Sequence, residues 1–215
     1  MPRPQRTGVP MHQLPSRINL PIPRGKRPSA VGGHVSRFAL APTVRCVGEP
    51  RFRTLSVADA GCQLNVDLSV LAWICRPLAL THRGRTLLPA FEVAGNTAVE
   101  LVAVSVDYEH VPDWAVARGM PIVAVSTSQL MGNRLKNARE LVRYATWRAS
   151  LSDRVRLLAA LDQEGSLPLG EAMTAIRNGT DPIGAIAALA LRRFVDLDLN
   201  SGRIGPETRV ARRRD

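Results

Sequence analysis

Apolar and polar residues follow two different rhythms along the chain. Between residues 54 and 148, short apolar runs typical of strands are interspersed with stretches of helical spacing. After residue 150, apolar residues recur three and four positions apart, which is typical of short amphipathic helices. The pattern therefore predicts a mixed α/β layer followed by a small, mainly helical unit.

The first rhythm predicts the order helix, three strands, helix, strand, helix. The strands are expected at residues 69–82, 86–94, 98–106 and 120–127, and the helices at residues 54–66, 111–119 and 126–148. Pro77 indicates an edge or a bulge in the first strand, because proline donates no ladder hydrogen bond. The run at 120–127 is short and apolar enough for a central strand.

The second rhythm predicts three short helices and a hairpin. They are expected at residues 151–165, 168–179 and 180–195, with the hairpin at 195–214. Ser152 is the predicted N-cap of the first helix, and Thr180 or Asp181 caps the third, with Pro182 at its first position. The hairpin is expected to turn at Asn200-Ser201-Gly202. Three helices followed by a hairpin are the plan of a winged helix.

Charge and composition narrow the classes of partner. The chain has 215 residues and a formal net charge of +11, which favours an anionic partner, with nucleic acid ahead of membrane. No apolar run approaches ~18 residues, so we expect no membrane-spanning helix and no membrane partner. The basic, proline-broken start lacks the apolar segment of a secretory signal, which favours a cytoplasmic location. Cys46, Cys62 and Cys75 are too widely spaced for a disulfide framework and are expected to be reduced thiols.

Three segments differ in composition. Residues 1–50 form a basic, proline-rich arm that is expected to be flexible, because it cannot bury enough apolar surface to offset its ordering entropy. The arm is either a solvated tail or a segment that lies along phosphates or a partner, and Arg24, Lys26 and Arg27 are its predicted DNA contacts. The α/β layer is expected at residues 51–149, and the helical unit with its basic tail at 150–215.

Several short strings occur in a recognisable order. "CRPLAL" begins at Cys75, Pro89-Ala90-Phe91 follows, and "ELVAVS" occupies residues 100–105, ahead of "STSQLMGNRLKNARELVRY" at 126–144. In order and character these strings resemble the TnsA-type endonuclease subunit of heteromeric transposases, over roughly residues 50 to 210. The resemblance implies an α/β fold class: a restriction-endonuclease-like mixed sheet with flanking helices, followed by a small winged-helix domain.

The resemblance also locates the expected catalytic positions, and this chain lacks the required groups there. Nucleases of this kind hold a divalent cation with carboxylates and use a nearby lysine. The matching positions for the two acids and the lysine are Ala90, Ala103 and Ser105, which cannot hold a hard cation. We therefore expect no catalytic residue, no metal site and no cofactor, with magnesium required only if the chain is an active nuclease.

Three charged residues are the weaker candidates for a relocated site. Glu92 is two residues from Ala90 and is expected to share its face of the strand. Asp59 lies on the preceding helix, where the family carries a further acid. Lys136 lies on a later helix from which it could reach the sheet.

The winged-helix region offers basic residues and an apolar third helix. Because recognition helices normally present polar side chains to the groove, this helix is a weak candidate for reading bases. Its apolar face, if exposed, would suit a protein partner. The predicted phosphate contacts, whose alternative is a solvated basic surface, are Arg177, Arg203, Arg209, Arg212, Arg213 and Arg214.

Three functions remain open at this point. The first is a catalytically inactive TnsA-like assembly factor that bridges DNA and transposition proteins. The second is an active metal-dependent DNA endonuclease with a relocated site, and the third is a winged-helix DNA-binding regulator. The resemblance implies a recombinase-like transposase subunit and an AAA ATPase regulator as partners, and no small-molecule substrate.

Overall fold

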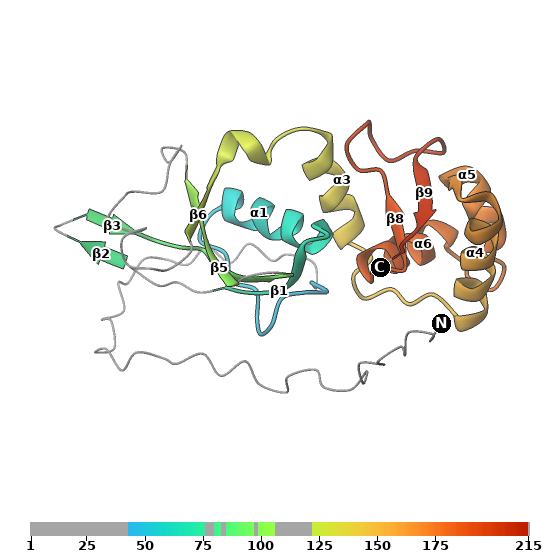
Figure 1. Ribbon diagram of the computed structural model, residues 1–215, viewed down its shortest axis with the longest axis horizontal. Coiled ribbons are helices and arrows are strands. Elements are labelled where there is room, and N and C mark those ends of the chain that lie inside the picture. Colours follow the sequence, from blue (N-terminus) through green and yellow to red (C-terminus); the bar gives the residue numbers. More distant parts are fainter. Residues whose placement is uncertain (1–42, 76–79, 83–84, 97–98, 106–121, 215) are drawn as a thin grey trace, which may run out of the picture. The chain divides into compact units, whose positions relative to one another are not determined.

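The computed structural model describes residues 43–75, 80–82, 85–96, 99–105 and 122–214 (Figure 1). All of these belong to one compact unit, residues 33–215. The described residues form a mixed α/β structure with five α-helices and a four-stranded mixed sheet, which confirms the predicted α/β class. The predicted helix at 111–119 and the arm contacts Arg24, Lys26 and Arg27 lie outside the described residues.

The main sheet contains four strands in the order β1-β4-β5-β6. These are β1 (Val70–Cys75), β4 (Phe91–Gly95), β5 (Val99–Ser105) and β6 (Ile122–Ser126). The pairs β1–β4 and β4–β5 are antiparallel, whereas β5–β6 is parallel. Within the described sheet β6 is the last strand, so its predicted central position is wrong, and the side chain of Val123 is 38% exposed. A short apolar run does not distinguish a central strand from one that is covered on one side only.

Two of the predicted strands are each divided. β2 (Leu80–His82) and β3 (Arg85–Leu87) pair with one another in a separate antiparallel ladder. The run predicted as one strand at 86–94 therefore contributes to two sheets, and the break falls at residues 88–90. Pro89 explains this break, because a residue without an N–H cannot continue the ladder.

Helix α1 (Leu55–Val66) covers one face of the main sheet (Figure 1), in agreement with the predicted helix at 54–66. Its N-cap is Thr54, whose hydroxyl accepts a hydrogen bond from the N–H of Val57 at 3.2 Å. Beneath the helix, the rings of Phe52, Trp73 and Phe91 pack together, with 5.3 Å between the Trp73 and Phe91 centroids. This aromatic cluster is the centre of the first core.

The helix predicted at 126–148 is interrupted. Ser126 caps a short 3-10 helix, Thr127–Leu130, and α3 begins only at Asn133 and ends at Val142. Gly132 separates the two with a φ of 92°, a left-handed conformation that glycine adopts without steric cost. The apolar spacing continues through the interruption, so periodicity alone did not reveal it. Gly132 sets the position of the interruption.

The C-terminal region (residues 150–214) is a helical layer with a three-stranded antiparallel sheet of order β7-β9-β8. Its elements are α4 (Leu151–Glu164), β7 (Ser166–Pro168), α5 (Leu169–Ala172) with the 3-10 helix Met173–Ala175, α6 (Pro182–Leu191), β8 (Val195–Leu197) and β9 (Arg209–Arg212). The predicted helix at 168–179 is thus much shorter, and β7 was not foreseen. Ser150, not Ser152, caps α4.

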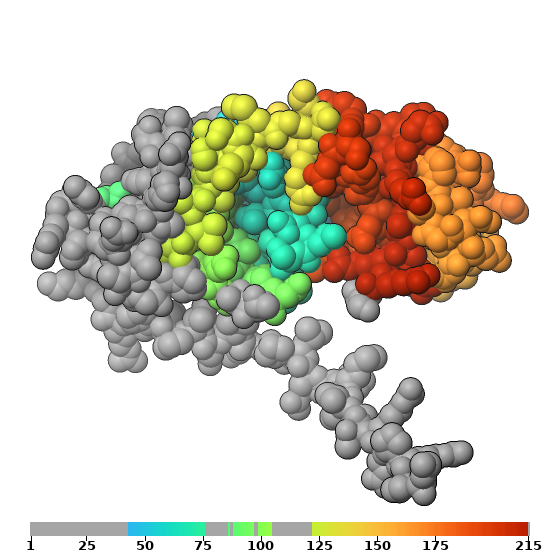
Figure 2. Space-filling model, turned by 45° about the horizontal axis from the view of Figure 1, so that its top comes forward, coloured from blue at the N-terminus to red at the C-terminus, as the bar shows by residue number. Residues whose placement is uncertain are grey.

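The predicted hairpin is confirmed as a strand pair but not as a tight turn. β8 and β9 pair antiparallel, and residues 198–208 connect them. The turn predicted at Asn200-Ser201-Gly202 is wrong because Asn137 of α3 organises this connection instead. The buried Asn137 amide donates to the carbonyls of Leu199 at 2.9 Å and Gly202 at 2.7 Å, and its oxygen accepts from the N–H of Ile204 at 3.1 Å. In Figure 2 the C-terminal residues (red) lie directly against the α3 segment (yellow).

Helix α6 begins as predicted and ends earlier than predicted. Asp181 caps it, with its carboxylate accepting from the N–H of Gly184 at 2.9 Å, and Pro182 occupies the first helical position. The helix stops at Leu191 because Arg193 adopts a φ of 63°, in the left-handed region that usually holds glycine. The Arg193 guanidinium donates to the carbonyls of Asp67 and Val70, so this turn is fixed against the sheet region (residues 43–149).

Contacts between the two regions make a third core. It contains Leu141, Val142 and Ala145 from one side and Ala187, Leu191 and Leu199 from the other. Arg45 adds a hydrogen bond from its guanidinium to the carbonyl of Leu191 at 3.1 Å. The predicted boundary between 149 and 150 stays a prediction. Within the described ranges, no helix has both the length and the apolar character needed to cross a membrane.

Gly61 of α1 gives a direct test of the first core. A Cβ atom at this position would lie 2.8 Å from the ring of Phe52, which is buried. We expect Gly61→Ala to lower the free energy of unfolding by up to about 2 kcal/mol, because the overpacking cost of about 1–3 kcal/mol outweighs the helix-propensity gain of at most about 1 kcal/mol. Denaturant unfolding measures this, with Gln63→Ala on the same helix as the control. Stabilisation by Gly61→Ala would contradict the described packing.

Candidate functional site

A pocket of about 580 Å³ lies beside Ala90, at the end of β1 and the start of α1. We call it the Ala90 pocket. It is lined by Glu49, Arg51, Arg53, Thr54, Val57, Cys75, Leu88, Ala90 and Val104. The position that the family resemblance assigns to the first acid therefore faces a real pocket, and its methyl group supplies no ligand atom.

Glu92 does not share the side of Ala90, which corrects the expected pairing. Ala90 precedes β4, donates its N–H to the carbonyl of Val102 at 2.8 Å, and packs against the core beneath α1. Within β4, Phe91 and Val93 are buried in that same core. Because successive strand residues alternate, Glu92 lies on the opposite face of the sheet from α1. The expectation failed because Ala90 is outside the regular strand, where the two-residue period does not apply.

The positions matched to the second acid and the lysine carry no carboxylate and no amine. This also holds if the match along β5 is moved by one residue. Ala103 is buried, at 2% exposure, and is aligned with Ala124 of β6, while Ser105 is aligned with Ser126. The residue of β5 that lines the Ala90 pocket is Val104. A shift of one residue would thus exchange alanine and serine for valines, and would restore no carboxylate and no amine.

Asp59 and Lys136 do not line the Ala90 pocket either. The Asp59 carboxylate pairs with Arg139 of α3, accepting from Nε at 2.9 Å and from Nη2 at 2.6 Å. Lys136 is exposed on α3. The sheet separates Glu92 from α1, so the three substitute candidates are not brought together. Among the described residues, no group of three or more His, Cys, Asp or Glu side chains could hold a metal ion.

The polar groups that do line the Ala90 pocket are poorly suited to catalysis. Glu49 forms an exposed ion pair with Arg51, at 2.8 Å between the carboxylate and Nη2. The Cys75 sulfur accepts from the N–H of Arg51 at 3.3 Å, and burial raises the pKa of this thiol. Burial likewise raises the pKa of the adjacent Cys46 to about 11. Neither thiol is activated as a nucleophile at neutral pH.

The apolar residues of the third helix of the C-terminal region, α6, are mostly buried. In α6, every residue from Gly184 to Leu189 is buried, as is Leu191. The helix packs inside its own region and against α3. It is therefore unavailable to a protein partner and to a DNA groove, and the protein contact that an exposed face at 181–194 would have allowed does not apply. Ile183, at 43% exposure, is the exposed exception among the apolar residues of α6.

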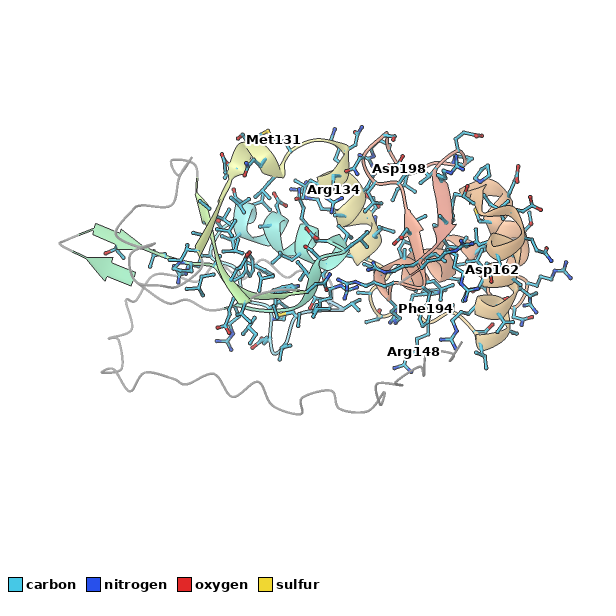
Figure 3. All side chains as sticks on the ribbon, in the orientation of Figure 1. Met131, Arg134, Arg148, Asp162, Phe194 and Asp198 are labelled. Carbon is cyan, nitrogen blue, oxygen red and sulfur yellow. The ribbon has the colours of Figure 1, made fainter. Side chains whose placement is uncertain are left out.

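The predicted phosphate contacts of the C-terminal region divide into two groups. Arg177, Arg203, Arg209 and Arg214 are exposed. Arg212 forms an ion pair with Asp162 of α4, labelled in Figure 3, and Arg213 lies 3.9 Å from the Asp196 carboxylate. The presumed tail is thus partly strand β9, and two of its charges are already balanced by acids.

Three further arginines surround a second pocket and were missed by sequence reasoning. Arg148, Arg154 and Arg192 line a pocket of about 270 Å³ together with Phe194. They come from the segment before α4, from α4 and from the end of α6. No spacing along the chain joins them, so only the folded structure reveals the group. Arg148 and Phe194 are labelled in Figure 3.

The buried Asp153 fixes the loop that carries Arg177. Its carboxylate accepts hydrogen bonds from Ser150 Oγ, Arg156 Nη2 and the backbone N–H groups of Arg177 and Asn178. Burial alone would raise the pKa of this carboxyl, but these donors outweigh burial and hold the pKa of Asp153 well below its ordinary value. The ionised form therefore stabilises the fold.

This carboxylate predicts a pH dependence. Because the folded-state pKa is lowered, its stabilisation is present above the unfolded pKa of about 3.9 and is lost as the pH falls from there through the folded-state value. We expect Asp153→Asn to cost about 1–3 kcal/mol at neutral pH and to flatten the loss of stability below about pH 4. Thermal unfolding as a function of pH measures both, with Glu171→Gln on α5 as the control. An unchanged acid slope in Asp153→Asn would contradict the assignment.

No protein-family model and no curated protein matches the chain. The two pockets and the exposed arginines are the features on which a function can be argued. One pocket lacks the groups for metal-dependent hydrolysis, and the other is rich in cationic groups.

Proposed function

We propose that this chain is a TnsA-like transposition protein that binds DNA and partner proteins without cutting DNA. The observation that carries the proposal is the Ala90 pocket, whose lining has an alanine at the position that the resemblance matches to the first acid and Val104 beside it. A bacterial cytoplasmic location belongs to the same proposal.

The sheet region supports the restriction-endonuclease-like part of the proposal. A helix is followed by three antiparallel strands, β1, β4 and β5, and then by β6, which is parallel to β5. This succession has the mixed sheet and the flanking helix that the family resemblance implies. The strings that carry the resemblance also fall at corresponding places, since Pro89-Ala90-Phe91 leads into β4 and residues 100–105 belong to β5.

The C-terminal region supports the winged-helix part. Its elements run helix, strand, two helices and two strands, and the last strand, β9, lies between β7 and β8. The long connection between β8 and β9 corresponds to a wing. A plain regulator that reads bases through its third helix is disfavoured, because α6 is buried.

Hydrolysis requires a metal ion that the Ala90 pocket is not equipped to hold. Magnesium is bound through carboxylate oxygens, usually with one or two supplied by the protein. The acid in the lining, Glu49, is exposed and paired with Arg51. Among the described residues of the lining, the cations are Arg51, which pairs with Glu49, and Arg53, and no lysine is present. The alternative of an active nuclease is therefore disfavoured as well.

DNA binding in this proposal is electrostatic and weakly sequence-specific. The net charge is +11, and Arg177, Arg203 and Arg209 are exposed on the C-terminal region. Contacts from arginine to phosphate position a protein on the duplex but do not read the bases. With α6 buried, no described helix is available for the major groove in the usual winged-helix manner.

Protein partners remain part of the proposal through the family resemblance, which implies a transposase subunit and an AAA ATPase regulator. The contact surface cannot be α6. Leu151 and Val155 lie one turn apart on α4 and are 66% and 57% exposed. An exposed apolar pair of this kind is a suitable contact for a partner.

The absence of cleavage is the first test. We expect the purified chain to leave supercoiled plasmid intact in the presence of Mg²⁺ or Mn²⁺, because the Ala90 pocket provides no carboxylate pair. Gel analysis of nicked and linear forms measures this, with an active nuclease as the positive control. Metal-dependent nicking that disappears in Glu92→Ala would establish the relocated site and reject the proposal.

Salt dependence is the second test. We expect duplex affinity to fall at least about tenfold between about 50 mM and about 200 mM salt, since two phosphate contacts already produce such a loss. Fluorescence anisotropy with duplexes of unrelated sequence measures affinity and specificity together. An affinity that is insensitive to salt, or that differs greatly between sequences, would argue against phosphate-directed binding.

A further inference from the structure

We propose that Arg148, Arg154 and Arg192 bind a phosphate group of the DNA backbone in the second pocket, which we call the Arg148 pocket. This inference rests on the proposed function and assigns one of its contact sites. The pocket has a volume of about 270 Å³ and is lined by Arg148, Ala149, Arg154, Ala188, Leu189, Arg192 and Phe194. Among the described residues, the lining contains three arginines and no acidic residue.

Two of the arginines are held in place by the fold. The Arg192 guanidinium donates through Nη1 to the carbonyl of Ala188 at 3.1 Å and through Nη2 to that of Ala145 at 2.9 Å. The Arg154 guanidinium lies 4.7 Å above the centroid of the Phe194 ring. Little side-chain entropy is therefore lost when these groups receive an anion, which favours binding.

Arg148 completes the pocket from an exposed position. It lies just before α4, and its label and that of Phe194 fall on the same side of the C-terminal region in Figure 3. An exposed arginine with five N–H donors can turn toward an incoming oxygen at little cost. Two preorganised arginines and one exposed arginine are a suitable arrangement for a ligand that arrives from solvent.

The electrostatics favour an oxygen anion over other ligands. Arginine remains charged at any physiological pH, so three guanidinium groups around one cavity repel one another until an anion lies between them. Guanidinium groups match the geometry of phosphate oxygens. Other basic side chains are already neutralised, as Arg212 pairs with Asp162 and Arg213 contacts Asp196. The Arg148 pocket therefore concentrates positive charge that no lining acid balances.

The salt dependence of DNA binding tests the assignment. We expect the double variant Arg148→Ala/Arg154→Ala to reduce the slope of log Kobs against log salt by about one and to weaken binding about fivefold to tenfold at about 0.1 M salt, because one phosphate contact is lost, with a smaller loss in Arg148→Ala and Arg154→Ala alone. The matched control is Arg143→Ala, which removes an equally positive and exposed side chain that pairs with Glu140 at 3.2 Å. Arg154→Lys is a second variant, because it keeps a positive charge over the Phe194 ring. Thermal unfolding checks that each variant is folded.

The outcomes separate this inference from the function on which it rests. If the unaltered chain binds no DNA, both are rejected. If it binds DNA but the double variant Arg148→Ala/Arg154→Ala behaves like Arg143→Ala, the Arg148 pocket is not a contact site, and the proposed function stands. If calorimetry shows that inorganic phosphate binds through these arginines while their DNA slopes are unchanged, the pocket takes free phosphate, and the DNA assignment is overturned.

Discussion

A hard divalent cation such as magnesium is held on a protein by oxygen atoms, and the lining of the Ala90 pocket has to be compared with that requirement. The Ala90 pocket is large enough to hold a ligand, and the sheet beside it is a mixed four-stranded sheet of order β1-β4-β5-β6. Its walls at the decisive points are the side chains of Ala90 and Val104, with a protonated thiol at Cys75. The proposed function is therefore binding without hydrolysis.

The burial of α6 has an equally broad consequence. This helix serves the interior of the C-terminal region and its contact with α3, so it connects the two regions instead of facing a partner. Arg193 adds to this connection at a cost in backbone strain of about 1–2 kcal/mol, which its hydrogen bonds to Asp67 and Val70 offset. In the proposed function, contacts with DNA and protein partners are therefore assigned to exposed arginines and to the surface of α4.

The sequence predicted those features that follow from local periodicity and capping. The helix at 54–66, the strand at 98–106 and the cap of α6 by Asp181 with Pro182 are all present. Features that depend on a single residue were missed, such as the breaks at Pro89 and Gly132. The Arg148 pocket was missed for another reason, since Arg192 comes from a segment remote in sequence from Arg148 and Arg154. The empty acid positions were visible from the sequence, but the side of the sheet on which Ala90 lies was not.

The most direct measurement of the central claim is Mn²⁺ binding to the protein–DNA complex, followed by electron paramagnetic resonance. The account predicts that the complex retains no more Mn²⁺ than the same DNA alone, because the Ala90 pocket supplies no pair of carboxylates. A stoichiometric site that appears only in the complex, and that is lost in Glu49→Ala or Glu92→Ala, would contradict the account.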